Sequence, residues 1–226
     1  MASAAACPYS TGMSTPAPSP PPILQVDDLS FGYPHQAPLF SNWSAAIPAG
    51  VTLLFGDSGS GKSTLLRLLS GVGKVEGRLR AGDFRFDEDP VAYRRQVFWT
   101  KPGTEAFDQL TPRHLAQSFE TVPGLDWAAW EQHIEGFGLQ PHVAKPLYQL
   151  STGSKRKALM AAGLASDHLV TLLDEPTSAL DSGSIAYLMT ILKQRSALAN
   201  RATVLASFEG LPDVQQAHVI SLAAPG

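Results

Sequence analysis

The stretch Gly56-Asp57-Ser58-Gly59-Ser60-Gly61-Lys62-Ser63-Thr64 decides the fold of this chain of 226 residues. It follows a short apolar run at residues 51–55, which is typical of a buried strand, and precedes a predicted helix over residues 62–69. Glycines here let backbone N–H groups turn inward around an anion, and the start of the helix adds a favourable dipole. Average residue frequencies would produce this P-loop pattern by chance in under about 1% of chains this long.

The side chains of this loop have predictable roles. Lys62 reaches the β- and γ-phosphates of a nucleoside triphosphate, and the hydroxyl of Ser63 ligates Mg²⁺. The other contacts to the nucleotide are expected from the rest of the loop, namely Gly56, Asp57, Ser58, Gly59, Ser60, Gly61 and Thr64.

The run Leu169-Val170-Thr171-Leu172-Leu173-Asp174-Glu175 supplies the second half of such a site. An apolar strand delivers Asp174 at its carboxyl end, where ligands gather in open α/β sheets, so Asp174 can hold Mg²⁺ through water. Glu175 is placed to polarise a water molecule for attack on the γ-phosphorus, which makes it the candidate catalytic residue. Adjacent carboxylates at a strand end are often solvated turn residues, but the P-loop upstream favours the catalytic interpretation.

Strands alternate with helices along the rest of the chain. The expected strands are residues 23–31, 40–47, 51–55, 78–80, 84–86, 97–99, 169–173, 203–206 and 219–222. The expected helices are residues 62–69, 127–137 with Asp126 as N-cap, 151–166 and 182–198. This alternation predicts an α/β fold with a mostly parallel sheet, and the helical run at about residues 104–165 predicts a small helical lobe.

Composition excludes several classes of protein. The formal net charge of −3 provides no basic field for nucleic acid, so no nucleic-acid partner is expected. Cys7 is the single cysteine and cannot form an internal disulfide, which fits a reducing compartment. The six histidines are scattered without the spacing of metal ligands, so a Cys/His metal cage is not expected.

The N-terminal segment differs from the rest. Residues 1–22 are rich in Ala, Ser, Thr and Pro and are predicted to be a disordered tail, which leaves residues 23–226 as one nucleotide-binding domain. The N-terminus has no basic patch followed by an apolar segment, so no signal peptide is expected. No apolar run approaches the roughly 18 residues that span a bilayer. A role at a membrane would therefore require docking to another protein.

Three further motifs resemble those of the ATP-binding cassette family. Leu150-Ser151-Thr152-Gly153-Ser154, which ends 20 residues before Asp174, looks like the signature of that family. Glu175-Pro176-Thr177-Ser178-Ala179-Leu180-Asp181 resembles its Walker B exit and D-loop, and Tyr33 resembles the aromatic residue that stacks on adenine. The resemblance covers about residues 23–223. It implies a P-loop NTPase core with an N-terminal antiparallel β-subdomain and an inserted helical lobe.

The resemblance also implies cofactors, partners and a location. ATP and Mg²⁺ would be bound, and two subunits would enclose two ATP molecules head to tail. Ser151 and Gly153 would then face the γ-phosphate held by a second subunit, either an identical or a different chain. A membrane permease would be the other partner, so the chain would be cytoplasmic and peripheral at the inner face of a membrane.

The chain departs from the family pattern at four positions. Thr152 and Ser154 stand where Gly and Gln are usual, which weakens the signature, although the Ser154 hydroxyl is expected to keep a phosphate contact. Lys101 takes the place of the Q-loop glutamine and either pairs with the γ-phosphate as a point charge or faces solvent. Phe208 takes the place of the switch histidine and offers no hydrogen bond to the γ-phosphate.

These departures leave three functions open. The leading hypothesis is an ATP-binding subunit that hydrolyses MgATP slowly and drives a separate membrane permease. The second is a hydrolysis-poor nucleotide-binding partner in a heterodimer, and the third is a soluble cassette ATPase without a permease. Residues 144–149 do not resemble the motif of fused multidrug-type exporters.

Other features receive plainer interpretations. The Trp127/Trp130 stripe is expected in the core of the helical lobe, and the acidic residues Asp83, Asp87, Glu88 and Asp89 are expected on the surface. The run Lys155-Arg156-Lys157 is predicted to be a solvated face of the signature helix.

Overall fold

The computed structural model of the protein describes residues 21–99, 103–211 and 213–223. The predicted tail at residues 1–22 lies almost wholly outside the described residues, as do Cys7 and Lys101. The expectations for these residues, and the extent of the predicted domain at 23–226, stay predictions.

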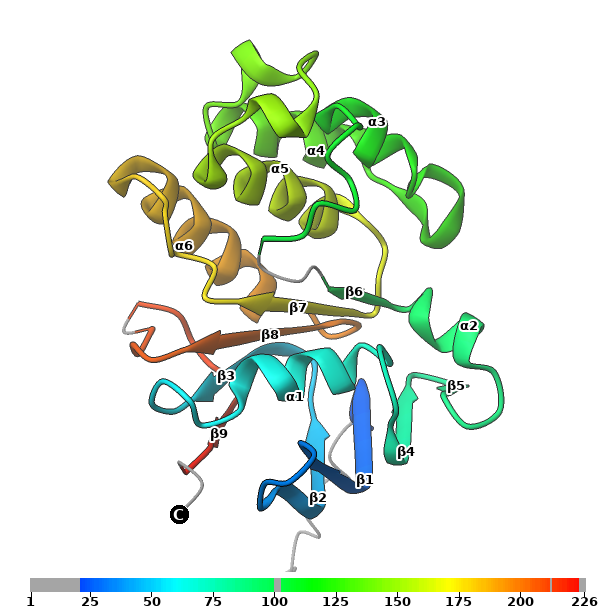
Figure 1. Cartoon of the computed structure of the whole chain (residues 1–226). Helices are drawn as coiled ribbons and strands as arrows, with labels where there is room; N and C mark the ends of the chain where they lie inside the picture. Colours follow the sequence, from blue (N-terminus) through cyan, green and yellow to red (C-terminus); the bar gives the residue numbers. More distant parts are fainter. Residues whose placement is uncertain (1–20, 100–102, 212, 224–226) are drawn as a thin grey trace, which may run out of the picture.

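A parallel sheet of five strands forms the centre of the molecule (Figure 1). Its strand order is β6–β7–β8–β3–β9, and every neighbouring pair is parallel. The strands are β3 (Gly50–Phe55), β6 (Val97–Trp99), β7 (Val170–Asp174), β8 (Ala202–Ser207) and β9 (His218–Ser221). The carboxyl ends of β3 and β7, with β8 between them, therefore lie at one edge of the sheet, where a ligand site is expected.

A second, antiparallel sheet packs below the first in Figure 1, with the strand order β2–β1–β4–β5. Its strands are β1 (Leu24–Gly32), β2 (Pro38–Ile47), β4 (Glu76–Ala81) and β5 (Phe84–Arg85). Strands β1 and β2, predicted at residues 23–31 and 40–47, form a hairpin in which Gly32 pairs with Pro38. Tyr33 lies at the tip of this hairpin.

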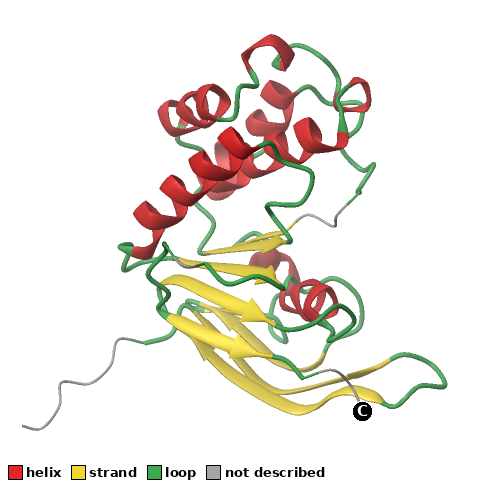
Figure 2. Cartoon of the chain, turned by 90° about the vertical axis from the view of Figure 1, so that its left-hand side faces the viewer, coloured by secondary structure: helices red, strands yellow, loops and turns green. Residues whose placement is uncertain are grey.

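The helices fall into two groups. Helix α1 (Lys62–Leu69) follows the P-loop, α2 (Pro90–Arg94) precedes β6, and α6 (Ser182–Ser196) follows β7. The helices that connect β6 to β7 gather on the far side of the parallel sheet from the antiparallel one (Figures 1 and 2). They are α3 (Pro112–Gln117), α4 (Trp127–Gly136) and α5 (Thr152–Ala165), with short turns at Glu120–Gly124, Gln140–His142 and Leu147–Gln149.

The parallel sheet separates two apolar cores. Leu172 of β7 packs into the core shared with α1 and the antiparallel sheet, whereas its neighbour Leu173 packs into the core shared with α6 and the helical lobe. Leu54 and Leu53 of β3 divide in the same way. Because successive side chains of a strand point to opposite faces, these strands are apolar throughout, as in other sheets covered on both sides.

The tryptophan stripe of α4 lies in the helical-lobe core, as predicted. Trp130 is 1% exposed, and Trp127 meets it edge to face with ring centroids 5.3 Å apart. The guanidinium of Arg113 on α3 lies 5.3 Å from the Trp130 ring centroid and holds the two helices together through a cation–π contact. Asp126 caps α4 by accepting a hydrogen bond from Ala129 N–H, again as predicted.

The predicted α/β fold class is confirmed, and the predicted elements agree with the observed ones to within two residues, but α2 was missed. Asp89 caps this short helix by accepting from Val91 N–H and Ala92 N–H, and Pro90 occupies its first turn. The acidic stretch is exposed as predicted. Asp89 followed by Pro90 is a typical helix start, and this signal within the acidic stretch could have predicted α2.

Two buried histidines stabilise the region between the helical lobe and the sheet. Nδ1 of His133 lies 3.0 Å from the Tyr187 hydroxyl of α6, and Nδ1 of His168 lies 2.6 Å from the Ser166 hydroxyl. Burial, with a smaller contribution from the charge of Arg195, lowers the pKa of each histidine to about 4. Both rings are therefore neutral in the folded chain at neutral pH.

The buried histidines predict acid destabilisation. Between pH 6.5 and about 4 the unfolded chain binds protons at these sites and the folded chain does not, so their contribution is complete above pH 6.5 and is lost as pH falls towards 4. Each should lower the free energy of unfolding by about 2 kcal/mol between pH 7.5 and pH 5. Urea unfolding at the two pH values should show His168→Gln reducing this difference, whereas the exposed-site control His218→Gln leaves it unchanged. An equal difference in both variants would contradict the assignment.

Candidate functional site

The P-loop joins β3 to α1 in a conformation that its glycines allow. Gly61 precedes α1 with φ of 93°, in the left-handed region that favours glycine. At Gly56 a Cβ atom would lie only 2.6 Å from the Leu222 carbonyl oxygen and 2.7 Å from Ser60 Oγ, so a larger residue would displace the loop. No side chain of the described residues caps α1, so its first N–H groups point out of the helix end as an anion site.

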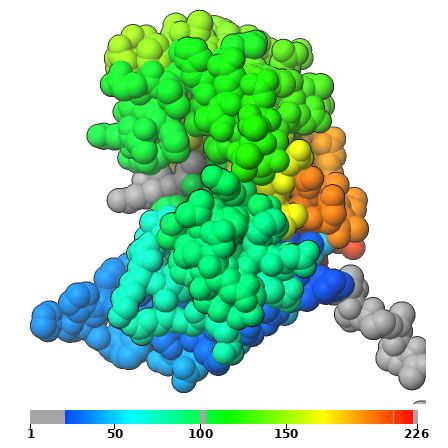
Figure 3. All heavy atoms as spheres, turned by 90° about the vertical axis from the view of Figure 1, so that its right-hand side faces the viewer, coloured from blue at the N-terminus to red at the C-terminus, as the bar shows by residue number. Residues whose placement is uncertain are grey.

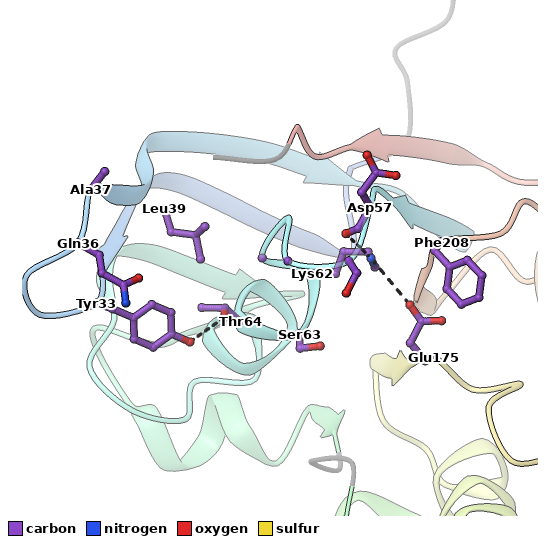
Figure 4. A pocket seen from close by; sticks show the side chains of 13 residues that line it. Tyr33, Gln36, Ala37, Leu39, Asp57, Lys62, Ser63, Thr64, Glu175 and Phe208 are labelled. Atoms are coloured by element: carbon purple, nitrogen blue, oxygen red, sulfur yellow. Dashed lines mark hydrogen bonds and ion pairs between the residues drawn. The ribbon is translucent and has the colours of Figure 1, made fainter. Parts of the chain in front are cut away.

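Lys62 lies at the centre of the loop. Its side chain is almost fully buried, and its ammonium group donates to the carbonyl oxygens of Gly56 at 2.6 Å and Asp57 at 3.0 Å. The same Nζ lies 3.8 Å from Oε1 of Glu175, as Figure 4 shows. The positive charge is thus held between the phosphate-binding loop and the carboxylate at the end of β7.

Asp174 and Ser63 fit a magnesium ion. Asp174 is 9% exposed, and neither of its carboxylate oxygens has a hydrogen-bond partner among the residues that the structure describes. Burial raises the pKa of Asp174, while the nearby Ser63 hydroxyl and the charges of Arg156 and Lys62 oppose that rise. A buried carboxylate that lacks partners is costly, and a hard cation with oxygen ligands would remove that cost.

Glu175 follows Asp174 at the edge of the sheet in an uncommon backbone conformation. Its φ of 43° is rare for a residue with a side chain, and its N–H donates to the Ala206 carbonyl at 3.0 Å. Burial raises the pKa of its carboxyl group, and the charge of Lys62 opposes the rise. The side chain turns towards the P-loop, where its carboxylate approaches the Lys62 ammonium group (Figure 4).

A cavity of about 930 Å³ lies over the P-loop and reaches from Tyr33 to Phe208. Tyr33 is 43% exposed, its hydroxyl lies 2.9 Å from Thr64 Oγ1, and its ring meets Phe31 edge to face. The cavity is lined by Tyr33, Gln36, Ala37, Leu39, Asp57, Ser58, Gly59, Gly61, Lys62, Ser63, Thr64, Glu175 and Phe208. Its size suits a nucleotide, and most of the expected contact residues meet there.

Three residues that line the cavity were not predicted from the sequence: Gln36, Ala37 and Leu39. They belong to the β1–β2 hairpin, and Leu39 packs against Gly61, where an added Cβ would lie 3.0 Å from a Leu39 methyl carbon. The two strands were predicted. The position of the hairpin over the P-loop depends on how the antiparallel sheet packs on the parallel one, which no local pattern reveals.

Phe208 lies at the far end of the cavity from Tyr33 (Figure 4). It follows β8 immediately, and its ring is 60% exposed. The ring faces the region of Glu175 with no polar atom to offer. This is the end of the cavity at which the terminal phosphate of a nucleotide held by the P-loop would lie.

Ser151 and Gly153 do not line the P-loop cavity. Ser151 caps α5 by accepting from Ser154 N–H at 3.2 Å, and a Cβ at Gly153 would collide with the Ala179 carbonyl oxygen of the D-loop. The structure therefore separates these two residues from the other site residues. Their expected contact with a nucleotide on a second subunit stays a prediction.

The prediction that Lys155-Arg156-Lys157 forms a solvated face was wrong. Lys155 Nζ lies 2.8 Å from Asp108 Oδ1, and Lys157 Nζ lies 2.5 Å from Asp181 Oδ2, which lowers the pKa of Asp181. Arg156 donates from Nη1 to the carbonyl oxygen of Glu175. All three side chains are partly buried because α5 runs close to the end of β7 and to the D-loop, a proximity that helical periodicity alone does not predict.

A P-loop between a buried parallel strand and a helix, with an acidic residue at the end of a nearby strand, defines a P-loop nucleotide-binding protein. Residues 40–178, more than half of the chain, match the ABC transporter family. The chain belongs to the ABC transporter family, and it is an ATP-binding subunit of that type, an ATP hydrolase that takes ATP with Mg²⁺.

Curated relatives agree with this assignment. The chain is 34% identical over 178 residues to a nickel import ATP-binding protein of Rhodobacter capsulatus, covering 71% of this chain and 68% of that one. It is 31% identical over 189 residues to a cytochrome c biogenesis ATP-binding export protein of Rhodospirillum rubrum, covering 83% and 81%. An energy-coupling factor transporter ATP-binding protein of Methanospirillum hungatei is 32% identical over 187 residues, with 76% of this chain but only 46% of that protein covered.

The fold is shared with solved structures. A structure described as the ATP-binding subunit of an ABC transporter superposes with a TM-score of 0.72 at 23% identity, covering 82% of this chain and 79% of that one. A second, described as an ATP-binding protein of a transporter from Pyrococcus furiosus, gives a TM-score of 0.68 at 20% identity and covers 88% and 96%.

The central position of Lys62 predicts its importance for binding. Lys62→Ala removes a charge-assisted contact to the phosphates, so the Kd for MgATP should rise by about 10- to 100-fold. A fluorescent ATP analogue titrated in the presence of Mg²⁺ measures this. Lys74→Ala is the matched control, because the Lys74 side chain is 84% exposed and pairs only with Glu76 among the described residues. Unchanged affinity of Lys62→Ala would contradict the site.

Proposed function

We propose that the chain binds MgATP in the cavity over the P-loop, hydrolyses it slowly, and drives a separate membrane permease. The convergence of Lys62, from the start of α1, with Asp174 and Glu175, from the end of β7, carries this proposal. The relatives named above, which are ATP-binding proteins of import and export systems, support the transport role.

Each residue has a role in this proposal. Tyr33 stacks on the adenine, and the N–H groups of residues 56–64 and Lys62 hold the phosphates. Ser63 and Asp174 would hold Mg²⁺, which neutralises charge on the phosphate oxygens when it is bound. Glu175 accepts a hydrogen bond from the attacking water and orients it towards the γ-phosphorus.

Slow turnover follows from Phe208. A residue that donates a hydrogen bond to the γ-phosphate stabilises the charge of the transition state, and losing such a contact typically costs on the order of 10²–10³ in rate, or about 3–4 kcal/mol. Nucleotide binding depends on the P-loop and the Mg²⁺ ligands, which Phe208 does not replace. The expected result is tight binding with a slow chemical step.

A second ATP-binding subunit completes the proposal. Ser151 and Gly153 lie at the start of α5 beside the D-loop rather than in the P-loop cavity of their own chain. Such a position suits contact with a nucleotide that another subunit holds, whether that subunit is identical or different. The start of α5 then offers N–H groups to the phosphate of the neighbouring subunit.

The proposed location is the cytoplasmic face of a membrane, reached through the permease. Among the described residues no helix has the length and apolar character to cross a bilayer. A groove of about 300 Å³ between α2 and the helical lobe contains the exposed side chains of Val91 and Val122 beside Arg94 and Arg95. Figure 3 shows the face on which α2 and the lobe meet. An apolar groove with a basic rim suits a cytoplasmic segment of a permease.

The second candidate function is a nucleotide-binding partner that hydrolyses poorly within a heterodimer, and Phe208 favours it. In both candidates Glu175→Gln should lower the rate of hydrolysis by about 10²-fold or more, to a small residual rate, while MgATP binding persists. Phe208→His tests the cause of slow hydrolysis that both candidates share. It should raise kcat at least tenfold if the missing donor limits turnover, which a steady-state phosphate-release assay measures. An unchanged kcat would show that Phe208 is not the limitation, and a wild type without MgATP affinity would overturn both candidates.

The groove predicts the effect of a charge on permease docking. Val122→Asp buries a carboxylate in an apolar contact, so co-purification of the chain with its permease from detergent-solubilised membranes should fall at least about tenfold. Val72→Asp is the control, because Val72 is similarly exposed and lies outside the groove. MgATP binding should be unchanged in both variants. Equal recovery of the two variants would exclude this groove as the docking surface.

A further inference from the structure

Arg156 connects the helical lobe to the candidate catalytic residue. It lies in the second turn of α5, the helix that Ser151 caps, and its Nη1 donates to the carbonyl oxygen of Glu175. The cations on either side have other partners, since Lys155 pairs with Asp108 and Lys157 with Asp181. Of these three neighbouring cations, Arg156 is the one whose contact falls on Glu175.

The backbone of Glu175 is held from several directions. Its N–H donates to Ala206 of β8 at 3.0 Å, and its carbonyl accepts from Ser178 N–H at 3.0 Å as well as from Arg156. A φ of 43° is unfavourable for a residue with a side chain and persists only where the surrounding structure fixes it. The guanidinium of Arg156 is the member of this set that comes from the helical lobe.

Arg156 also brings positive charge to the carboxylates without entering the nucleotide cavity. Its charge acts on both Asp174 and Glu175, and its side chain lines a separate cavity of about 290 Å³ on the lobe side of Asp174. It is absent from the lining of the cavity over the P-loop. A residue so placed affects how Glu175 is held, and not how the nucleotide is bound.

We propose that Arg156 is a positioning residue: by holding the Glu175 carbonyl from α5, it keeps the Glu175 carboxylate aimed at the γ-phosphate and makes that aim depend on the position of the helical lobe. The inference rests on the proposed function, in which Glu175 orients the attacking water. A shift of α5 away from β7 lengthens this contact and releases Glu175, so the lobe controls hydrolysis through one side chain.

The first test separates turnover from binding. Arg156→Gln should lower kcat for MgATP about tenfold or more, since a hydrogen bond from a charged donor is lost, while KM changes less than about twofold. Arg156→Lys should restore part of kcat, because an ammonium group can still donate to the carbonyl. Lys155→Gln, which removes the neighbouring cation and its pair with Asp108, should leave kcat within about twofold of wild type. Equal kcat in Arg156→Gln and wild type would overturn the proposal.

A double-mutant cycle excludes a merely structural effect. In the Glu175→Gln background, Arg156→Gln should lower the residual rate by less than about twofold, because the group that it positions is already absent. Full additivity of the two effects would overturn the proposal.

A second readout does not depend on turnover. Hydrogen–deuterium exchange at the amides of Glu175 and Ser178 should be faster in Arg156→Gln than in wild type, and unchanged in Lys155→Gln. If the wild type hydrolyses no MgATP, the proposed function is wrong. The exchange comparison still tests whether Arg156 holds the backbone of Glu175. Unchanged exchange at both amides in Arg156→Gln would overturn the inference.

Discussion

The structure depends on the close turn of backbone between β3 and α1. At Gly56 the chain passes so near Leu222 that no side chain fits, and at Gly61 it enters the helix from a left-handed conformation. This path points the free N–H groups of α1 and the ammonium group of Lys62 into one small volume. Unpaired donors and a buried cation are unfavourable without an anion nearby, so the same constraint that shapes the loop also makes it a site for polyphosphate.

The end of β7, at the same edge of the parallel sheet as the P-loop, supplies the negative charge. Asp174 is the last residue of β7 and pairs with Ala206 of β8, and Glu175 follows it directly. Burial favours the neutral form of both carboxyl groups, while Lys62 favours the charged form. The site therefore contains buried charges of both signs that balance one another incompletely. Phe208 adds no polar group to this balance, which separates the capacity to bind a nucleotide from the capacity to cleave it quickly.

Sequence reasoning predicted those features that depend on local pattern. The P-loop, the strand before Asp174 and the caps Asp126 and Ser151 are each specified by a few consecutive residues, and the structure contains all of them. The features it missed depend on packing between distant segments. Gln36 reaches the cavity only because the hairpin folds over α1, and Arg156 reaches Glu175 only because α5 passes the end of β7. The three cations of α5 have the spacing of a surface run, and their partners lie 19 to 47 residues away in the sequence.

Strand β7 has a consequence for how this chain can change during evolution. Leu172 and Leu173 are anchored in different cores, and the strand ends in the carboxylates that the site requires. Protein interiors are close-packed, so the surrounding side chains cannot adjust to a change of side-chain volume at either residue. Such a change would instead displace the strand and the carboxylates at its end. Sequence drift should therefore concentrate in the outer helices, which can diversify towards new partners while this strand stays constant.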